Sequence, residues 1–238
     1  MRRLIAKISG VDRAQELMRS LPGQDGVTFL RRSAAEFGVQ AKVVGTPVAL
    51  VEPTIFFSTH HTGAVDFLTT YPALSEIAPR LKVVANKDLL ALKPLSDILI
   101  PVNTISTGRA NAEARQEIIE HLRSGGNLLV YPAGKVGTMK RGRPFDFPWR
   151  TGIAEILKDE ARAAVPIYVA AKNAKFYYAA RRVFPKLGLV FLMSALTWRR
   201  DRGPIEVRVG TPIGRDVFEA MNPTDILALV RTAAYAMA

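Results

Sequence analysis

Hydrophobic residues occur along the chain in short runs that are bounded by Gly, Pro or polar residues. Such runs are typical of buried strands. Helical patterns separate most of them, and the clearest covers residues 109–123, with one apolar face and a Gly-Gly end. This alternation predicts an α/β fold, in which helices cover a mostly parallel central sheet and ligands bind beyond the carboxyl ends of its strands. The predicted strands are residues 41–44, 54–58, 81–85, 98–102, 127–131, 165–170 and 205–209.

The beginning of the chain has a different pattern. Apolar residues from Leu4 to Leu21 recur at three- and four-residue steps, with Arg and Lys between them. Basic amphipathic helices of this kind lie in anionic membrane surfaces, but an ordinary helix packed on a domain has the same pattern. We divide the chain into an N-terminal helical membrane-contact segment, residues 1–40, and one domain over residues 41–238.

Composition narrows the possible partners and chemistry. The 238 residues include 33 Lys and Arg against 21 Asp and Glu, a formal charge of +12, which favours a negatively charged partner. With 48% hydrophobic residues, the chain is not disordered. The absence of Cys excludes disulfides and thiolate nucleophiles, and with only 3 His we expect no metal site.

No segment is long enough to cross a membrane. The uncharged run 187–198 would reach about 18 Å as a helix, against a hydrocarbon layer of ~30 Å. Lys7 and Asp12 interrupt the first apolar residues before these form an apolar segment as long as that of a secretory signal peptide. We therefore expect a cytoplasmic protein. The run 187–198 and the aromatic residues 176–178 are either a second membrane contact or buried helices.

Two histidines lie where predicted strand 54–58 turns into a helix. His60 and His61 are followed by Gly63 and Asp66. A neutral imidazole can take the proton of an attacking hydroxyl, while a carboxylate on its other nitrogen fixes the tautomer. We predict that His61 pairs with Asp66 in this way. A pair of His60 with Asp66 is also possible, but it needs a longer reach. The structural alternative is that one histidine caps the helix and Asp66 interacts with the helix dipole.

A second group of candidate residues follows predicted strand 127–131. Pro132 and Gly134 lead into four positive charges within nine residues. Gly lets backbone amides approach a ligand, and Lys or Arg holds a phosphate or carboxylate, so the loop is a candidate anion site. A solvated basic loop is the alternative. The residues are Lys135, Lys140, Arg141 and Arg143, followed by Asp146 and Trp149.

These two segments, in this order and about 70 residues apart, resemble the glycerolipid acyltransferase family, whose members carry a His-x4-Asp block and later a Phe-Pro-Glu-Gly-like block. Here the blocks are residues 61–66 (HTGAVD) and 131–134 (YPAG), and weaker blocks occur at 165–167 and 209–213. The resemblance implies that residues 41–238 form an acyltransferase domain. It also implies that His61 is the base that deprotonates an acceptor hydroxyl, that Asp66 orients it, and that a fatty acyl thioester is the donor.

Departures from the family pattern narrow the acceptor. Members that act on lysophosphatidic acid usually have an Arg after the intermediate strand and a Glu after the Pro, but residues 101–104 read PVNT and 132–134 read PAG. Together with Asp146 and Trp149, this looks more like the bacterial branch that acylates lyso-ornithine lipid and related aminolipids. We therefore expect a lyso-aminolipid acceptor. The alternative is a 1-acylglycerol-3-phosphate acyltransferase, in which basic residues after Gly134 replace the missing Arg.

The resemblance also assigns roles to the remaining residues. Amides near Gly63 or Gly134 would stabilise the oxyanion, and the loop from Pro132 through Lys135, Lys140 and Arg141 would bind a headgroup carboxylate or the phosphates of acyl-CoA or acyl carrier protein. Trp149 either lines the acyl channel or fills the core. We expect no cofactor beyond the acyl donor, and a peripheral location on the anionic, cytoplasmic face of the inner membrane.

Two other classes of function fit the sequence less well. A nucleic-acid-binding protein would explain the charge, but the basic residues are spread along the chain and no such motif occurs. A serine hydrolase would need a nucleophile elbow, and Gly-x-Ser-x-Gly is absent.

Overall fold

The computed structural model describes residues 19, 23–45, 52–103, 111–173 and 203–238. Within these residues, one sheet has the order β1-β9-β8-β2-β5-β3-β4, with β10 beside β8. The pairs β1·β9, β2·β8, β2·β5, β3·β5 and β3·β4 are parallel, whereas β8·β9 and β10·β8 are antiparallel. The predicted α/β fold with a mostly parallel sheet is therefore confirmed.

The strands are β1 (Ala41–Val44), β2 (Thr54–Ser58), β3 (Leu81–Asn86), β4 (Leu99–Val102), β5 (Asn127–Val130), β6 (Thr138–Lys140), β7 (Arg143–Phe145), β8 (Ala163–Val169), β9 (Ile205–Val209) and β10 (Ile213–Gly214). The helices are α3 (Gly26–Glu36), α4 (Ala64–Leu74), α5 (Ala112–Arg123), α6 (Gly152–Glu160), α9 (Arg215–Phe218) and α10 (Pro223–Ala236), with short 3-10 turns η1 (Lys87–Ala91) and η2 (Lys93–Leu95). The predicted strands all form. The short β10 and the β6–β7 hairpin were not predicted, because strands of two or three residues carry too little pattern.

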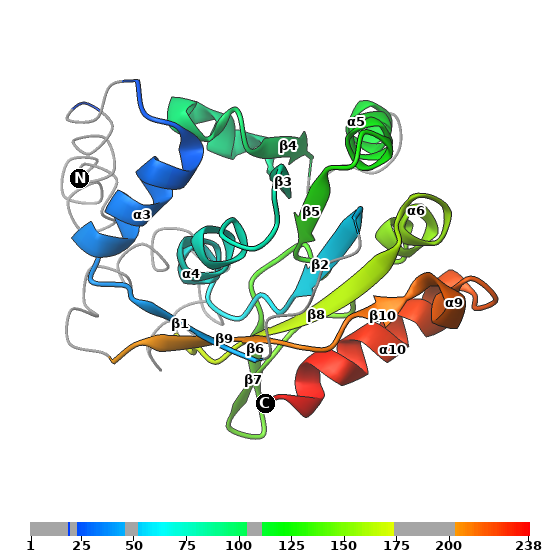
Figure 1. Cartoon of the computed structure of the whole chain (residues 1–238). Coiled ribbons are helices and arrows are strands. Elements are labelled where there is room, and N and C mark those ends of the chain that lie inside the picture. The colour runs from blue at the N-terminus through cyan, green and yellow to red at the C-terminus, as the bar shows by residue number, and fades with distance from the viewer. Residues whose placement is uncertain (1–18, 20–22, 46–51, 104–110, 174–202) are drawn as a thin grey trace.

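Helices cover both faces of the sheet and enclose two hydrophobic cores. Figure 1 shows α3 and α4 on one side and α5, α6 and α10 on the other. Along β2 the side chains alternate between the cores: Phe56 packs on the α4 side, while Ile55 and Phe57 pack on the α10 side. Every residue of β2 is buried, and its three central residues, Ile55 to Phe57, are consecutive apolar side chains, as expected for a strand covered on both faces.

Part of the predicted N-terminal membrane-contact segment is a helix of the domain. Asp25 caps α3 by accepting a hydrogen bond from the Thr28 amide, and Phe29 and Leu30 are buried in the core with α4. Most of the basic amphipathic pattern, at residues 1–18 and 20–22, lies outside the described residues, as do 176–178 and 187–198. A membrane role for the N-terminal residues stays a prediction. Among the described helices, none has both the length and the apolar composition needed to span a bilayer.

The topology brings the two candidate segments together. β2 lies between β5 and β8, and all three run parallel. Their carboxyl ends therefore meet at one edge of the sheet, and the turns that follow Ser58, Val130 and Val169 are neighbours. This edge is where ligands bind in open α/β sheets.

Asn127 is a buried polar link at the opposite edge. Its Oδ1 accepts the Thr54 N–H at 3.0 Å, and its Nδ2 donates to the Pro79 carbonyl at 2.8 Å. We expect Asn127→Ala to lower the free energy of unfolding by about 1 to 3 kcal/mol, because the buried Thr54 amide and the Pro79 carbonyl lose this partner. Urea denaturation would measure the loss. The exposed Gln116→Ala should change stability by less than about 0.5 kcal/mol, and equal effects of the two variants would contradict the assignment.

Candidate functional site

The turn after β2 places His60 against the carboxylate of Asp66. His60 Nδ1 lies 3.1 Å from Asp66 Oδ2, and the Asp66 side chain is fully buried while 18% of the His60 side chain is exposed. The N–H direction is not well aligned on the oxygen, and such contacts often tighten when substrate binds. One accessible imidazole is thus held beside a buried acid at the ligand-binding edge of the sheet.

The predicted pair of His61 with Asp66 is not formed. Asp66 contacts His60, whereas His61 Nε2 lies 3.0 Å from the hydroxyl of Tyr235 on α10. The physical reason is that the alternation of β2 continues past its end, so that successive side chains point to opposite faces of the sheet. His60 faces α4, like Phe56, and His61 faces α10, like Phe57.

Asp66 also holds the backbone of the turn. Its Oδ2 accepts the amides of Thr62 at 2.8 Å and Gly63 at 2.9 Å, and its Oδ1 accepts the Thr62 hydroxyl at 2.5 Å. Gly63 has a φ of 72°, a left-handed conformation that favours glycine. Asp66 therefore caps α4 and contacts a histidine at the same time, which combines the two interpretations that its spacing left open.

The amides of Gly63 and Gly134 themselves both donate hydrogen bonds within the protein. The Gly63 amide donates to Asp66, and the Gly134 amide donates to the Tyr131 carbonyl at 2.9 Å. Gly134, with φ at 63°, turns the chain, and a Cβ there would lie 3.3 Å from the Arg150 guanidinium carbon. Pro132 is buried and its carbonyl accepts the Arg150 amide. These residues shape the loop. An oxyanion role for amides near Gly63 or Gly134 stays a prediction.

The second candidate segment encloses His60 from the other side. Asp146 Oδ1 accepts the His60 amide at 3.0 Å, and the His60 carbonyl accepts the Gly137 amide at 2.6 Å. The Tyr131 ring lies against the imidazole, with ring centroids 4.5 Å apart. Both backbone groups of His60 are therefore fixed by residues more than seventy positions away.

Trp149 fills the core and supports Asp146. Its ring stacks with Phe57 at a centroid distance of 6.3 Å, and its Nε1 donates to Asp146 Oδ2 at 3.1 Å. Only 8% of Trp149 is exposed. Of the two roles predicted for Trp149, the structure shows core packing.

Lys135, Lys140 and Arg141 are exposed and lie along the β6–β7 hairpin and the turn before it. Lys135 Nζ lies 4.0 Å above the Phe147 ring, and Lys140 Nζ lies 5.0 Å from the centre of the Phe145 ring. Arg141 is at the tip of the hairpin. None of these three cations contacts the imidazole of His60 in the described structure. The base of the β6–β7 hairpin, however, contacts the His60 backbone.

Tyr235, which the sequence analysis missed, completes the site from α10. Its hydroxyl accepts the Asp146 amide at 2.8 Å and contacts His61 Nε2 at 3.0 Å, and His61 Nε2 is 3.7 Å from Asp146 Oδ1. Arg231, one turn earlier, donates to the Asp146 carbonyl and lies over the rings of Phe145 and Tyr235. No motif marks Tyr235, because only tertiary folding brings α10 to the turn.

Burial sets the protonation of this network. Desolvation raises the pKa of Asp146, and the nearby His61 and the Trp149 hydrogen bond partly oppose this. Burial also raises the pKa of Tyr235 and that of Tyr131. Both phenols therefore keep their protons at neutral pH and act as neutral hydrogen-bonding groups beside the histidines.

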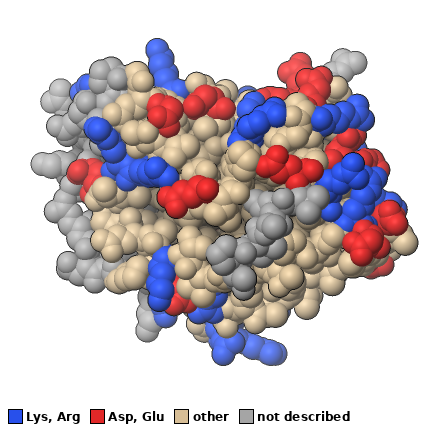
Figure 2. Space-filling model, in the orientation of Figure 1, with Lys and Arg blue, Asp and Glu red and all other residues tan. Residues whose placement is uncertain are grey.

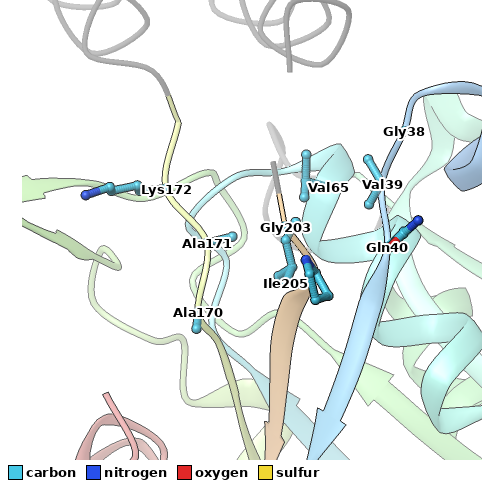
Figure 3. A pocket seen from close by; sticks show the side chains of 10 residues that line it. Gly38, Val39, Gln40, Val65, Ala170, Ala171, Lys172, Gly203 and Ile205 are labelled. Carbon is cyan, nitrogen blue, oxygen red and sulfur yellow. The ribbon is translucent and has the colours of Figure 1, made fainter. Parts of the chain in front are cut away.

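A largely apolar pocket of about 210 Å³ opens beside the start of α4. Figure 3 shows Val65 facing it from α4, with Val39 and Ile205 from neighbouring segments and Ala171 and Lys172 from the segment after β8. Val65 precedes Asp66, so the pocket adjoins the residue that contacts His60. Among the described residues, those of this site included, no three His, Asp or Glu side chains are arranged to hold a metal ion.

Comparisons with known proteins bear on the family and the fold of the chain. The family model described as Acyltransferase matches residues 51–213, which include the histidine turn, the hairpin and β9. The crystal structure of the 1-acyl-sn-glycerophosphate (LPA) acyltransferase PlsC from Thermotoga maritima is similar in fold, with a TM-score of 0.55 and 14% identity over 89% of this chain and 78% of that chain. No curated protein matches the chain.

Removing the hydroxyl of Tyr235 would test the link between α10 and the turn that carries His60 and His61. We expect Tyr235→Phe to lower the free energy of unfolding by about 1 to 3 kcal/mol, because the buried Asp146 amide and His61 both lose its hydroxyl. Thermal and urea unfolding would measure this. Tyr168→Phe is a matched control, since Tyr168 packs on His61 through its ring, and a loss as large in that variant would argue against the hydrogen bonds as the cause.

The raised pKa of Asp146 predicts the direction in which stability changes with pH. Its usual value is 3.8, and a higher pKa in the folded state stabilises the protein at low pH and loses that contribution as the pH rises through the folded-state value. Asp146→Asn cannot titrate. Between about pH 4 and pH 7 we therefore expect the stability of the wild type to fall relative to Asp146→Asn. Paired denaturation series that stay parallel across this range would contradict the assignment.

Proposed function

Because the chain belongs to the acyltransferase family, whose model matches residues 51–213, we propose that it transfers a fatty acyl group from an acyl thioester to the hydroxyl of a lysolipid. The observation that carries the proposal is the contact of His60 with buried Asp66 at the carboxyl edge of the sheet. An imidazole held by a carboxylate is the arrangement that removes a proton from an attacking hydroxyl.

In the proposed mechanism His60 is the general base. With Nδ1 turned to Asp66, Nε2 takes the proton of the acceptor hydroxyl as its oxygen attacks the thioester carbonyl. The C–S bond then breaks, the ester forms, and the imidazolium returns the proton to the leaving thiolate. Asp66 stabilises the imidazolium between these two steps. No covalent acyl-enzyme is needed.

His61 has a positioning role in this mechanism. Its side chain is fully buried, and it lies between Tyr235 and Asp146. Asp146 also accepts the His60 amide, so the His61 network fixes the backbone from which the base projects. The assignment of the base thus moves by one residue from His61, as first expected, to His60.

For the acceptor, we keep a lyso-aminolipid such as lyso-ornithine lipid as the proposed substrate. At the position of the usual family Glu stands Ala133, which is 1% exposed and packed in the core, so its side chain cannot bind a headgroup. The second candidate is 1-acylglycerol-3-phosphate. It is supported by the fold similarity to PlsC and by Arg150, an exposed cation beside Gly134.

The remaining partners follow from this chemistry. The proposed donor is acyl-CoA or acyl carrier protein, with no further cofactor, and the proposed location is peripheral, on the cytoplasmic face of the inner membrane. The formal charge of +12 agrees with an anionic surface. Retention on DNA that falls with salt, without acyl transfer, would favour a nucleic-acid-binding protein instead.

Replacing each histidine separately tests the mechanism. We expect His60→Ala to lower acyl transfer by about 100-fold or more, because the general base is lost. His61→Gln should be clearly less damaging, since it only loosens the turn. The purified proteins would be assayed with an acyl-CoA and either lyso-ornithine lipid or 1-acylglycerol-3-phosphate, with products identified by mass spectrometry.

Circular dichroism would establish that both variants are folded. Transfer by His60→Ala at the wild-type rate would refute His60 as the base. A loss confined to His61→Gln would restore the original assignment. Product formed only from 1-acylglycerol-3-phosphate would select the second acceptor.

A further inference from the structure

The β6–β7 hairpin projects from the edge of the domain. It forms a separate two-stranded sheet in the described part of the chain, with Thr138 opposite Phe145, Met139 opposite Pro144, and Lys140 opposite Arg143. Figure 1 shows it below the main sheet, near the C-terminus. Figure 2, in the same orientation, shows basic side chains projecting at this lower edge of the molecule.

The tip of the hairpin concentrates like charges. Lys140, Arg141 and Arg143 are all exposed, and Lys140 lies directly across from Arg143. Like charges in this cross-strand position repel and destabilise a hairpin. Among the described residues no acidic side chain forms an ion pair with any of the three. An anion bound from outside would remove the repulsion.

The turn itself uses an unfavourable residue. Arg141 and Gly142 have φ angles of 49° and 78°, so both are left-handed. A two-residue turn of this kind favours Asn or Asp before Gly, and a long side chain at the first position costs about 1 to 2 kcal/mol. Arg141 therefore adds a charge at the expense of hairpin stability, which indicates that the charge has a function.

The neighbouring side chains favour a lipid surface over a protein partner. Partly buried apolar residues, Met139, Pro144 and Phe145, lie directly behind the cations on the two strands. Lys and Arg beside apolar side chains suit the boundary between headgroups and acyl chains. A narrow hairpin tip makes a small contact with a plane, whereas a stable protein interface needs about 800 Å² from each partner.

We propose that the tip of the β6–β7 hairpin, Lys140 to Arg143, docks the protein on bilayers that contain anionic phospholipids. This inference rests on the proposed function, which takes its acceptor from a membrane. The base of the hairpin is attached to His60 through the Gly137 amide and Asp146. The four residue-to-residue steps from Gly137 to Arg141 span about 13 Å when extended. Docking at the tip would hold the general base at roughly this distance from the headgroups.

Binding to vesicles tests the proposal without acyl transfer. The full chain would be mixed with phosphatidylcholine vesicles, with or without phosphatidylglycerol, and separated by flotation. The test variant carries Lys140→Gln, Arg141→Asn and Arg143→Gln, of which Arg141→Asn also improves the turn. We expect its affinity for the anionic vesicles to fall roughly 10- to 100-fold, because each cation near such a surface contributes about a factor of five.

A control variant removes three charges elsewhere. Arg32→Gln, Lys87→Gln and Lys93→Gln change exposed residues of α3, η1 and η2, at the other end of the molecule in Figure 1. The control should bind anionic vesicles within about twofold of the wild type, and wild-type binding should weaken as salt rises. Thermal unfolding would establish that both variants are folded. Equal losses in the two variants would overturn the proposal, since binding would then depend on total charge alone.

The remaining outcomes separate this inference from the function. His60→Ala should bind vesicles like the wild type, so hairpin-dependent binding without any transfer would refute the function and leave the docking site standing. If the hairpin variant binds vesicles normally but has a raised KM for acyl-CoA, or loses binding to acyl carrier protein, the hairpin serves the donor and the docking proposal is wrong.

Discussion

The buried carboxylate of Asp66 is the constraint on which the site depends. Burying an ionised acid is costly unless hydrogen bonds and an opposite charge offset the loss of water. Here two backbone amides and one hydroxyl meet that requirement, and His60 supplies the nearby imidazole. The same hydrogen bonds force the tight turn at Gly63. The shape of the turn and the polarity beside His60 therefore have one cause.

A second acid completes the support of the turn. Asp146 receives the His60 amide and the Trp149 indole, and its own amide donates to Tyr235. The two faces of the sheet thus meet at the histidines: α4 reaches His60 through Asp66, and α10 reaches His61 through Tyr235. Because His60 is held from both sides through its backbone, its ring has a defined position while part of it stays accessible.

This arrangement explains why two adjacent histidines differ in role. Both follow the same strand, and residue type alone does not distinguish them. The alternation of β2 continues through Thr59, so that one ring is accessible beside Asp66 and the next is enclosed. A base must meet its substrate, and the exposed fraction of His60 meets this requirement whereas the full burial of His61 does not.

Much of the fold could be read from the sequence, because its evidence is local. Short apolar runs alternating with amphipathic segments predict a parallel sheet covered by helices, and histidines and glycines at strand ends mark the edge where ligands bind. The position of Asp66 in the first turn of α4 likewise follows from nearby residues. Spacing could not decide which imidazole faces Asp66, since a shift of one residue reverses the face of the sheet.

The contributions of α10 and the hairpin depend on contacts between distant parts of the chain. Tyr235 is 174 positions from His61, and its helix carries only an ordinary amphipathic pattern. Strands β6 and β7 are too short to show a period, so the opposition of Lys140 and Arg143 appears only when they pair. The sequence by itself determined the class of fold and the kinds of side chain available for chemistry. Tertiary packing decided which of them meet, because only packing sets the direction of a side chain relative to residues far away in the chain.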